Sequence, residues 1–172
     1  MLSVAGDVVQ ATPPEPSLGA GNNRSPTAWA FVDYPRFGVD ATTGRYFGEL
    51  PVGRWGAGAM PPEDVGVPVT AADVFTSHLL HVDNADETLR RYRGSVTFDA
   101  EIVAIFVSDE RLGASDLSTA LDFSDDAGRG TEVFSNDTDG DVVERMPDGL
   151  TVRFDVRVDG EDRVDQIRVI TR

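Results

Sequence analysis

Acidic residues dominate the part of the chain that could bind a metal ion. One loop places aspartates at alternating positions and ends on another aspartate at its twelfth position: Asp137, Asp139, Asp141 and Asp148. Calcium binds about six to eight oxygen atoms, and loops with this spacing supply them. The match is incomplete, because Val142 stands where such a loop has glycine and the final acid is not the longer glutamate. Two predictions stay open: a calcium loop, and an acidic hairpin turn built on Asp-Gly, which the missing glycine favours.

A second pair of carboxylates could meet across a loop. Asp116 and Glu132 are separated along the chain, and Arg129 lies close to Glu132. Together the two acids would either hold a cation or form an ion pair with Arg129 that fastens the loops to each other.

The two histidines of the chain, His78 and His81, are three residues apart on a predicted strand. Side chains alternate along a strand, so these two point to opposite faces and do not bind one metal together. We expect one of them to be buried and the other exposed.

Seven of the 14 aromatic residues fall between residues 29 and 55. Tyr and Trp combine a large apolar ring with a polar group, which suits them to stack on sugar rings. The candidates for such a carbohydrate platform are Trp55, Tyr46 and Tyr34. The alternative, that these aromatic residues form the core of the first strands, is favoured because large rings supply much buried area.

No motif of a catalytic nucleophile is present. The chain has no cysteine and no Gly-x-Ser-x-Gly sequence. Acid pairs do suit a glycoside hydrolase, but among thirty acids a pair carries little information. The sequence therefore predicts a protein that is not an enzyme, with a glycan-active hydrolase as the third alternative.

The amino-acid composition indicates which classes of partner the chain can bind. The 172 residues include 30 acids and 15 arginines, no lysine, and a net charge of −15. This length suits one domain. Binding to nucleic acid is excluded, because phosphates require clustered basic residues. Cations, Ca²⁺ among them, are plausible partners, and the acidic surface is typical of salt adaptation.

Residues 1–27 are predicted to form an extended N-terminal arm, because residues 7–27 are rich in proline and glycine. We expect self-association through residues 7–27, and a folded monomer when 1–27 are removed. The sequence shows neither a basic leader nor an apolar run of about 18 residues, so we expect neither a signal peptide nor membrane insertion.

Residues 28–172 are predicted to form a single β-sandwich domain. Residues 150–158 alternate between apolar and polar, which is typical of a strand with one wet face. Residues 102–106 are apolar throughout and are predicted to form a central strand next to 95–98. Further strands are expected from residue 28, in 43–50, 65–70, 74–83, 92–99 and 164–171, and a short helix in 109–121. This pattern predicts an all-β, antiparallel, jelly-roll-like sandwich.

Several stretches of the second half resemble a group of secreted bacterial proteins that carry a PEP-CTERM sorting tail. They are residues 78–83, 94–99, 102–106, 108–109, 112–116, 129–132 and 164–171, in that order. The resemblance implies an extracellular β-rich domain of unassigned biochemical role. Neither leader nor sorting tail is seen in this sequence, as expected for a mature chain or for a member without them.

These observations together predict a non-catalytic structural protein outside the cell or at its surface. It would be stabilised by cations and would assemble through its N-terminal arm. A module that binds polysaccharide through the aromatic region 29–55 is the alternative.

Overall fold

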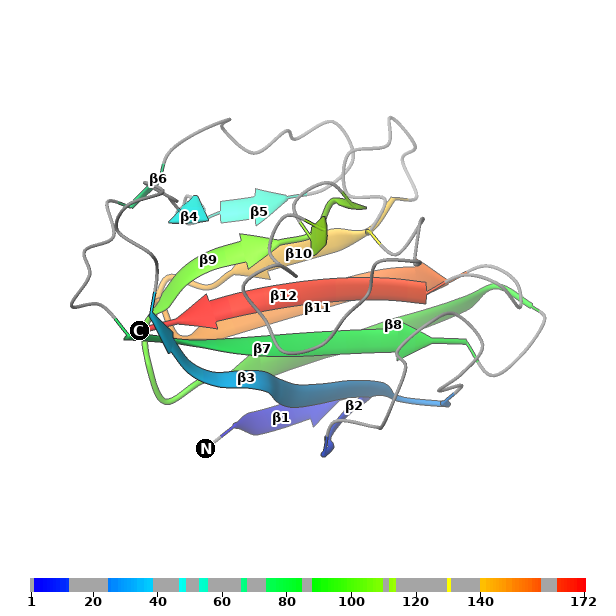
Figure 1. Ribbon diagram of the computed structural model, residues 1–172. Helices are drawn as coiled ribbons and strands as arrows, with labels where there is room; N and C mark the ends of the chain where they lie inside the picture. Colours follow the sequence, from blue (N-terminus) through cyan, green and yellow to red (C-terminus); the bar gives the residue numbers. More distant parts are fainter. Residues whose placement is uncertain are drawn as a thin grey trace.

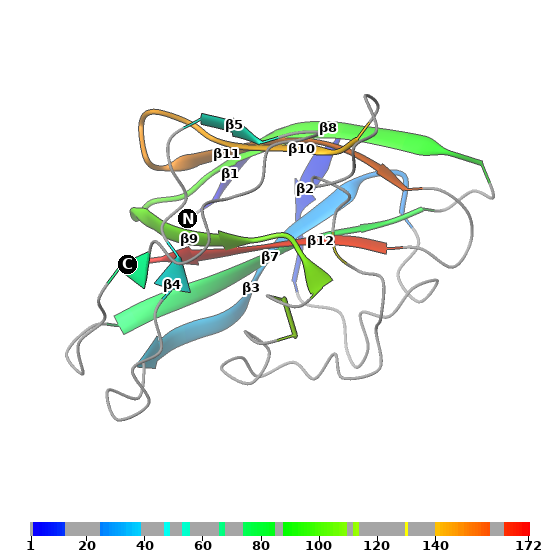
Figure 2. The same cartoon turned by 90° about the horizontal axis from the view of Figure 1, so that it is seen from above.

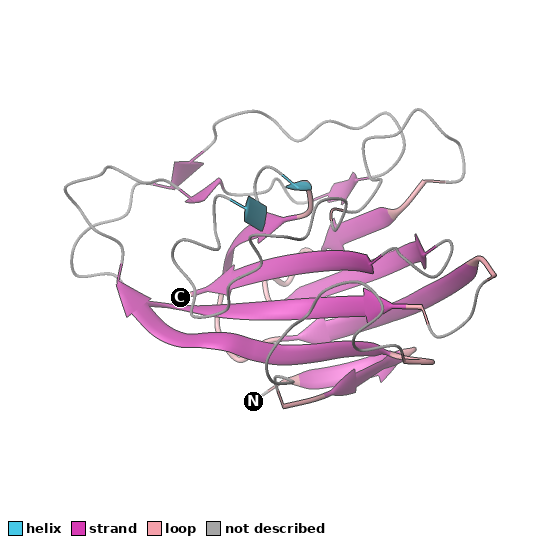
Figure 3. Cartoon of the chain, turned by 45° about the vertical axis from the view of Figure 1, so that its right-hand side comes forward, coloured by secondary structure: helices cyan, strands magenta, loops and turns pink. Residues whose placement is uncertain are grey.

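The computed structural model describes residues 2–12, 25–38, 47–48, 53–55, 66–67, 74–84, 88–109, 112–113, 130, 140–158 and 164–172. Most of these lie in strands (Figure 3). The strands are β1 (Ser3–Gly6), β2 (Val8–Gln10), β3 (Ala28–Gly38), β4 (Phe47–Gly48), β5 (Gly53–Trp55), β6 (Gly66–Val67), β7 (Val74–Asp83), β8 (Arg90–Thr97), β9 (Ile102–Phe106), β10 (Val142–Arg145), β11 (Thr151–Val158) and β12 (Val164–Thr171). Among the described residues no helix is long and apolar enough to cross a membrane.

Two five-stranded sheets form the sandwich. Sheet A has the order β1-β8-β11-β10-β5 and sheet B the order β2-β3-β7-β12-β9, and β4 pairs with β6 (Figure 1). Viewed from above, the sheets lie as two layers (Figure 2). Neighbouring strands are antiparallel except β2 and β3, which are parallel. The prediction of an all-β sandwich is therefore confirmed.

The chain passes repeatedly between the layers, as in a jelly roll. The connections from β7 to β8, β8 to β9, β9 to β10 and β11 to β12 each join one sheet to the other. Two connections stay within one sheet: the hairpin of β10 and β11 in sheet A, and the link from β2 to β3 in sheet B.

The main core lies between the sheets and follows from the alternation of side chains. In β11 the apolar residues Val152, Phe154, Val156 and Val158 are buried, while the polar residues between them are exposed or half-buried. Leu80, Ile167 and Val169 of sheet B belong to the same core cluster. The predicted strand with one wet face is thus present in β11.

Strands β7 and β12 of sheet B are buried on their other face as well. Every residue of β12 and all but the first and third of β7 are buried. Two smaller apolar clusters lie outside the main core, around Phe106 and Ile170 and around Phe31 and Leu79. The strands β7, β12 and β9 of sheet B are therefore largely buried on both faces, whereas sheet A has one wet face.

The position predicted for residues 102–106 is wrong. They form β9 at the edge of sheet B, beside β12, and the expected neighbour β8 belongs to sheet A. All five residues of β9 are nevertheless buried. A continuous apolar run indicates burial on both faces, and burial does not require a central place in the sheet.

The N-terminal segment closes one side of both sheets. Leu2 and Val8 are buried in the main core, and the chain passes from β1 to β2 through Gly6 and Asp7. Gly6 has φ +89° and lies against the backbone of Arg93, so a side chain there would clash. Residues 2–10 of the predicted arm are thus part of the sandwich, and removing residues 1–27 would take two strands from it. Residues 13–24 lie outside the described residues.

Candidate functional site

Asp148 shapes the turn between β10 and β11. One carboxylate oxygen accepts hydrogen bonds from the Leu150 and Thr151 amides at 2.9 Å each, and the other accepts one from the Thr151 hydroxyl at 2.7 Å. The bond from the Leu150 amide is the main reason that the pKa of Asp148 is lowered, and the Thr151 hydroxyl adds to it. Gly149 adopts φ +70°, which favours glycine. Asp148 therefore stabilises the hairpin of β10 and β11, whereas Asp139, in the Asp-Gly turn of the alternative interpretation, lies outside the described residues.

Asp141 has a similar structural role at the other end of β10. It is buried, and its Oδ1 accepts a hydrogen bond of 2.7 Å from the Arg157 amide. The four residues of β10 separate Asp141 from Asp148, which corresponds to roughly 14 Å at the usual rise of a strand. Ligands of one calcium ion lie within about 5 Å of each other, so these two carboxylates do not converge on one cation.

The other predicted metal ligands lie outside the described residues. They are Asp116, Glu132, Asp137 and Asp139, together with Arg129. Within the part of the chain that the structure describes, no three His, Asp or Glu side chains are grouped as a metal site.

The histidines lie on opposite faces of β7, as predicted, but both are buried. His78 faces the main core, where its Nε2 lies 3.0 Å from the Thr171 hydroxyl and its ring packs on Phe98. His81 faces the other side, where its Nδ1 lies 3.3 Å from the Gln166 amide nitrogen. The expected exposed histidine is wrong because β7 is buried on both faces around His78 and His81.

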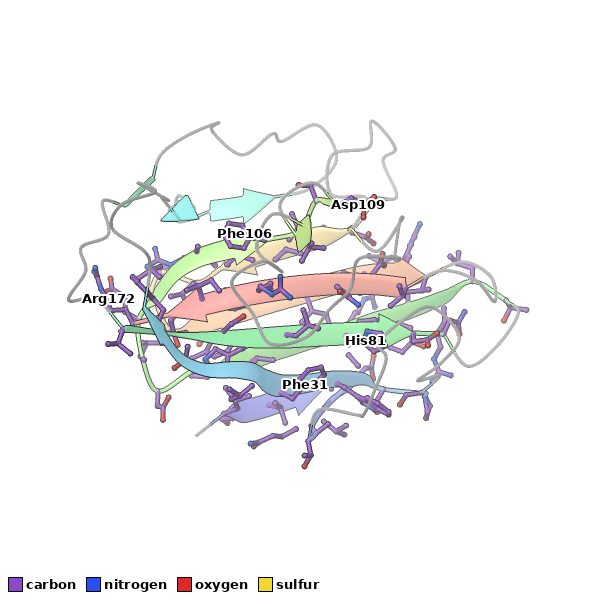
Figure 4. The ribbon with its side chains drawn as sticks, viewed as in Figure 1. Phe31, His81, Phe106, Asp109 and Arg172 are labelled. Atoms are coloured by element: carbon purple, nitrogen blue, oxygen red, sulfur yellow. The ribbon has the colours of Figure 1, made fainter. Side chains whose placement is uncertain are left out.

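Burial keeps both imidazoles neutral. The pKa of His78 and that of His81 are each lowered from 6.5 to about 4, mainly because the charged form would lose its water. His81 also lies near Trp29, with the ring centres 6.4 Å apart, and in Figure 4 it projects from β7. These histidines are therefore neutral hydrogen-bonding groups of the interior at pH 7.

A buried arginine and a short loop contact hold the covered face of sheet B. Arg168 of β12 is fully buried, and its guanidinium donates a hydrogen bond of 3.1 Å to the Leu112 carbonyl. Asp109 accepts one of 2.6 Å from the Gly130 amide, and Gly130 forms a bridge to Gln166 of β12. The segments 108–109, 112–113 and 130, which the sequence singled out, are thus fastened to one another and to β12. The described residues of the predicted short helix, Asp109, Leu112 and Gly113, are helical, and the Leu112 amide donates to the Ser108 carbonyl, four residues earlier.

The three aromatic candidates do not share one sheet. Tyr34 lies in β3 of sheet B, in register with Ser77, and Trp55 lies in β5 of sheet A, in register with Val143. Tyr46 lies outside the described residues. A carbohydrate platform made of these residues is therefore not assembled by a single sheet.

The wet face of sheet A carries a concentration of arginines that the sequence analysis missed. Seven of the fifteen arginines lie in the five strands of sheet A, against two of the thirty acids, so these strands carry +5 and the rest of the chain −20. Two of the seven do not belong to the wet face: Arg145 is buried and donates to the Ile102 carbonyl, and Arg90 is in register with the core residue Val158. Asp155 accepts hydrogen bonds from Arg91, at 2.7 Å from Nη2, and from Arg93 at 3.1 Å. Burial opposes ionisation of Asp155, but these arginines outweigh it and lower its pKa.

On the wet face of sheet A the described arginines outnumber the described acids. Arg91 lies directly opposite Arg157 in the register of β8 and β11, and like charges so placed repel each other. Arg153 lies 3.9 Å from Glu144, and its side chain is 68% exposed. The alternation of Arg153, Asp155 and Arg157 is visible in the sequence, but the whole-chain charge of −15 conceals it.

Comparisons with protein-family models, with curated proteins and with solved structures find no match to the chain.

Proposed function

We propose that this chain is a non-catalytic structural protein of the cell surface or extracellular space, which assembles into larger species through its N-terminal segment. The observation that carries the proposal is the edge formed by β1 and β2. The segment 2–12 lies at the end of both sheets and contains one charged residue, Asp7, in a chain that is 26% charged. The resemblance to secreted proteins of the PEP-CTERM-sorted type supports the extracellular setting.

The edge is suited to pair with another strand. Three of the four residues of β1 are exposed, and Val9 of β2 is 42% exposed. Asp7 forms two hydrogen bonds with the backbone of Arg93. The Asp7 amide donates to the Arg93 carbonyl at 2.7 Å, and the Asp7 carboxylate accepts from the Arg93 amide at 3.1 Å. Proteins usually protect an exposed edge with lysine, proline or a covering element, and this edge carries no lysine or proline.

A lysine on this edge tests the proposal. Val9→Lys is expected to abolish the concentration-dependent rise in mass measured by sedimentation, because a charged side chain opposes strand pairing. Val74→Lys is the matched control, since Val74 has a similar exposure of 46% but lies in β7, inside sheet B. A wild-type chain that stays monomeric, or equal assembly by both variants, would contradict the proposal.

Cations are proposed to stabilise the folded chain because of its acidic composition. A site occupied only in the folded state raises the melting temperature by mass action. We expect millimolar Ca²⁺ to raise it and a chelator to reverse the effect. Equal increases with Mg²⁺ or with Na⁺ at the same ionic strength would indicate charge screening and would remove the specific calcium site.

A further inference from the structure

We propose that the wet face of sheet A is an interface for a second copy of this chain, and that its arginines bind the acidic surface of that copy. The inference rests on the self-association of the proposed function and names a second contact for it. It starts from the unequal distribution of charge between sheet A and the rest of the chain.

The arginines of this face are placed to contact a partner. The side chains of Arg93 and Arg153 are 63% and 68% exposed. Arg91, Arg93, Arg153 and Arg157 all occupy the positions of β8 and β11 whose neighbours in sequence point to the core. Four guanidinium groups thus share one face of two adjacent strands, and among described side chains Asp155 and Glu144 are the acids on that face.

The arginines on this face outnumber the acids: Arg91, Arg93, Arg153 and Arg157 stand against Asp155 and Glu144 among the described side chains. Arg91 and Arg157 are directly opposite, and Asp155 already serves both Arg91 and Arg93. Guanidinium groups bind carboxylates in a bidentate geometry, so carboxylates of a partner suit these positions.

The same chain supplies the complementary charge. Outside the strands of sheet A it carries 28 acids and eight arginines, a net charge of −20. The contact pairs one surface with a different surface of the next copy, so it is heterologous and extends into a chain of molecules unless a ring closes. Such a contact agrees with an assembling structural protein, and Arg153, which tests it, lies in β11 and is separated from the edge strand β1 by β8.

Sedimentation at two salt concentrations tests the proposal. The average mass of the wild-type chain should rise with concentration at roughly 0.05 M NaCl and rise less at 1 M, where the screening length is only about 3 Å. Arg153→Glu should weaken association roughly fivefold at low salt, because one attractive pair becomes a repulsive one. Arg93→Glu, at a second exposed position, should act in the same direction.

Arg172→Glu is the matched control. Like Arg153 it is exposed and lies 3.9 Å from one glutamate, but it lies outside sheet A. Equal effects of Arg153→Glu and Arg172→Glu would overturn the inference. Wild-type chains that remain monomeric but bind polyglutamate through Arg153 would also overturn it, because the partner would then be a different polyanion.

The outcomes separate this inference from the proposed function. Loss of association in Val9→Lys with none in Arg153→Glu removes the arginine interface and leaves the N-terminal edge. The reverse result removes the edge and retains the interface. A wild-type chain that stays monomeric at both salt concentrations contradicts both.

Discussion

The two sheets of this sandwich have the same number of strands but different surroundings. Sheet A presents a wet face where arginines and a few acids form exposed ion pairs. In sheet B the strands β7 and β12 are largely buried on both faces, and their polar residues Ser77, His81, Gln166 and Arg168 lie in the interior. Ion pairs on the wet face of sheet A contribute little to the free energy of unfolding, whereas removing a buried hydrogen-bonding group from sheet B costs much more. Substituting the same residue type is therefore expected to change stability by different amounts in the two sheets.

Arginine gives the largest contrast. Arg168→Ala should lower the free energy of unfolding by about 3–5 kcal/mol, because it opens a cavity and removes the donor to the Leu112 carbonyl. Arg153→Ala on sheet A should cost less than about 1 kcal/mol. Urea unfolding measures both, and equal costs would mean that Arg168 is in effect a surface residue.

The contact between Asp109 and Gly130 gives the next effect. A Cβ at Gly130 would lie 2.6 Å from the Asp109 amide nitrogen and 2.9 Å from the Val107 carbonyl oxygen. Gly130→Ala should therefore cost about 1–3 kcal/mol through overpacking. At Gly113 a Cβ meets nothing within 4 Å, so Gly113→Ala should change stability by less than about 1 kcal/mol. Thermal melting measures the stability of both variants, and equal melting temperatures would contradict the close packing of Gly130 against Asp109 and Val107.

Acid should weaken sheet B through its histidines. Their pKa is lowered to about 4 in the folded chain, against 6.5 when unfolded, so the unfolded state binds more protons between these values. The contribution of the two neutral histidines to the free energy of unfolding is fully present above pH 6.5 and is lost as the pH falls towards 4. At pH 5.5 the loss is about 1 kcal/mol per histidine.

Urea unfolding at pH 7.5 and 5.5 measures that loss. The difference between the two pH values should shrink in His81→Gln, which removes one titrating group. The carboxylates with lowered pKa, Asp148 and Asp155, lose their contribution only below about pH 4, so they leave this window unaffected. An unchanged difference in His81→Gln would show that His81 is not buried in its neutral form.

The smallest effect concerns the ion pairs of sheet A. Asp155→Ala removes the carboxylate between Arg91 and Arg93 and should cost about 0.5–1 kcal/mol at low salt. In 1 M NaCl the cost should become smaller, because salt screens the remaining repulsion between the arginines. A cost that does not depend on salt would indicate that Asp155 acts through packing instead of charge.

The strands with strong patterns were predictable, and the weakly patterned ones were not. β7 and β12 have the predicted bounds, because long apolar or alternating runs specify strands. β1, β2 and β10 were missed, since short strands among Gly, Asp and Pro lack a clear period and depend on their partners. The sandwich itself followed from the number of strands and the turns between them.

The candidate site was less predictable because it depends on which strands become neighbours. The spacing of Asp141 and Asp148 resembles a calcium loop, but a strand lies between them. Sequence separation cannot show that β8 and β11 are adjacent and bring their arginines to one face. The burial of His81 and Arg168 likewise depends on the covered face of sheet B, which no local pattern reports.

The position of β12 has a consequence for how the chain folds. This strand ends at residue 171, yet it lies between β7 and β9 in sheet B. The register that joins β7, β12 and β9 therefore cannot form until synthesis has reached that residue. β1 likewise cannot pair until β8, about 90 residues later in the chain, has been synthesised. Pairings between strands so far apart in sequence are typical of slow-folding proteins. During synthesis the apolar strands therefore remain unpaired until the last residues are made, and unpaired strand edges favour aggregation.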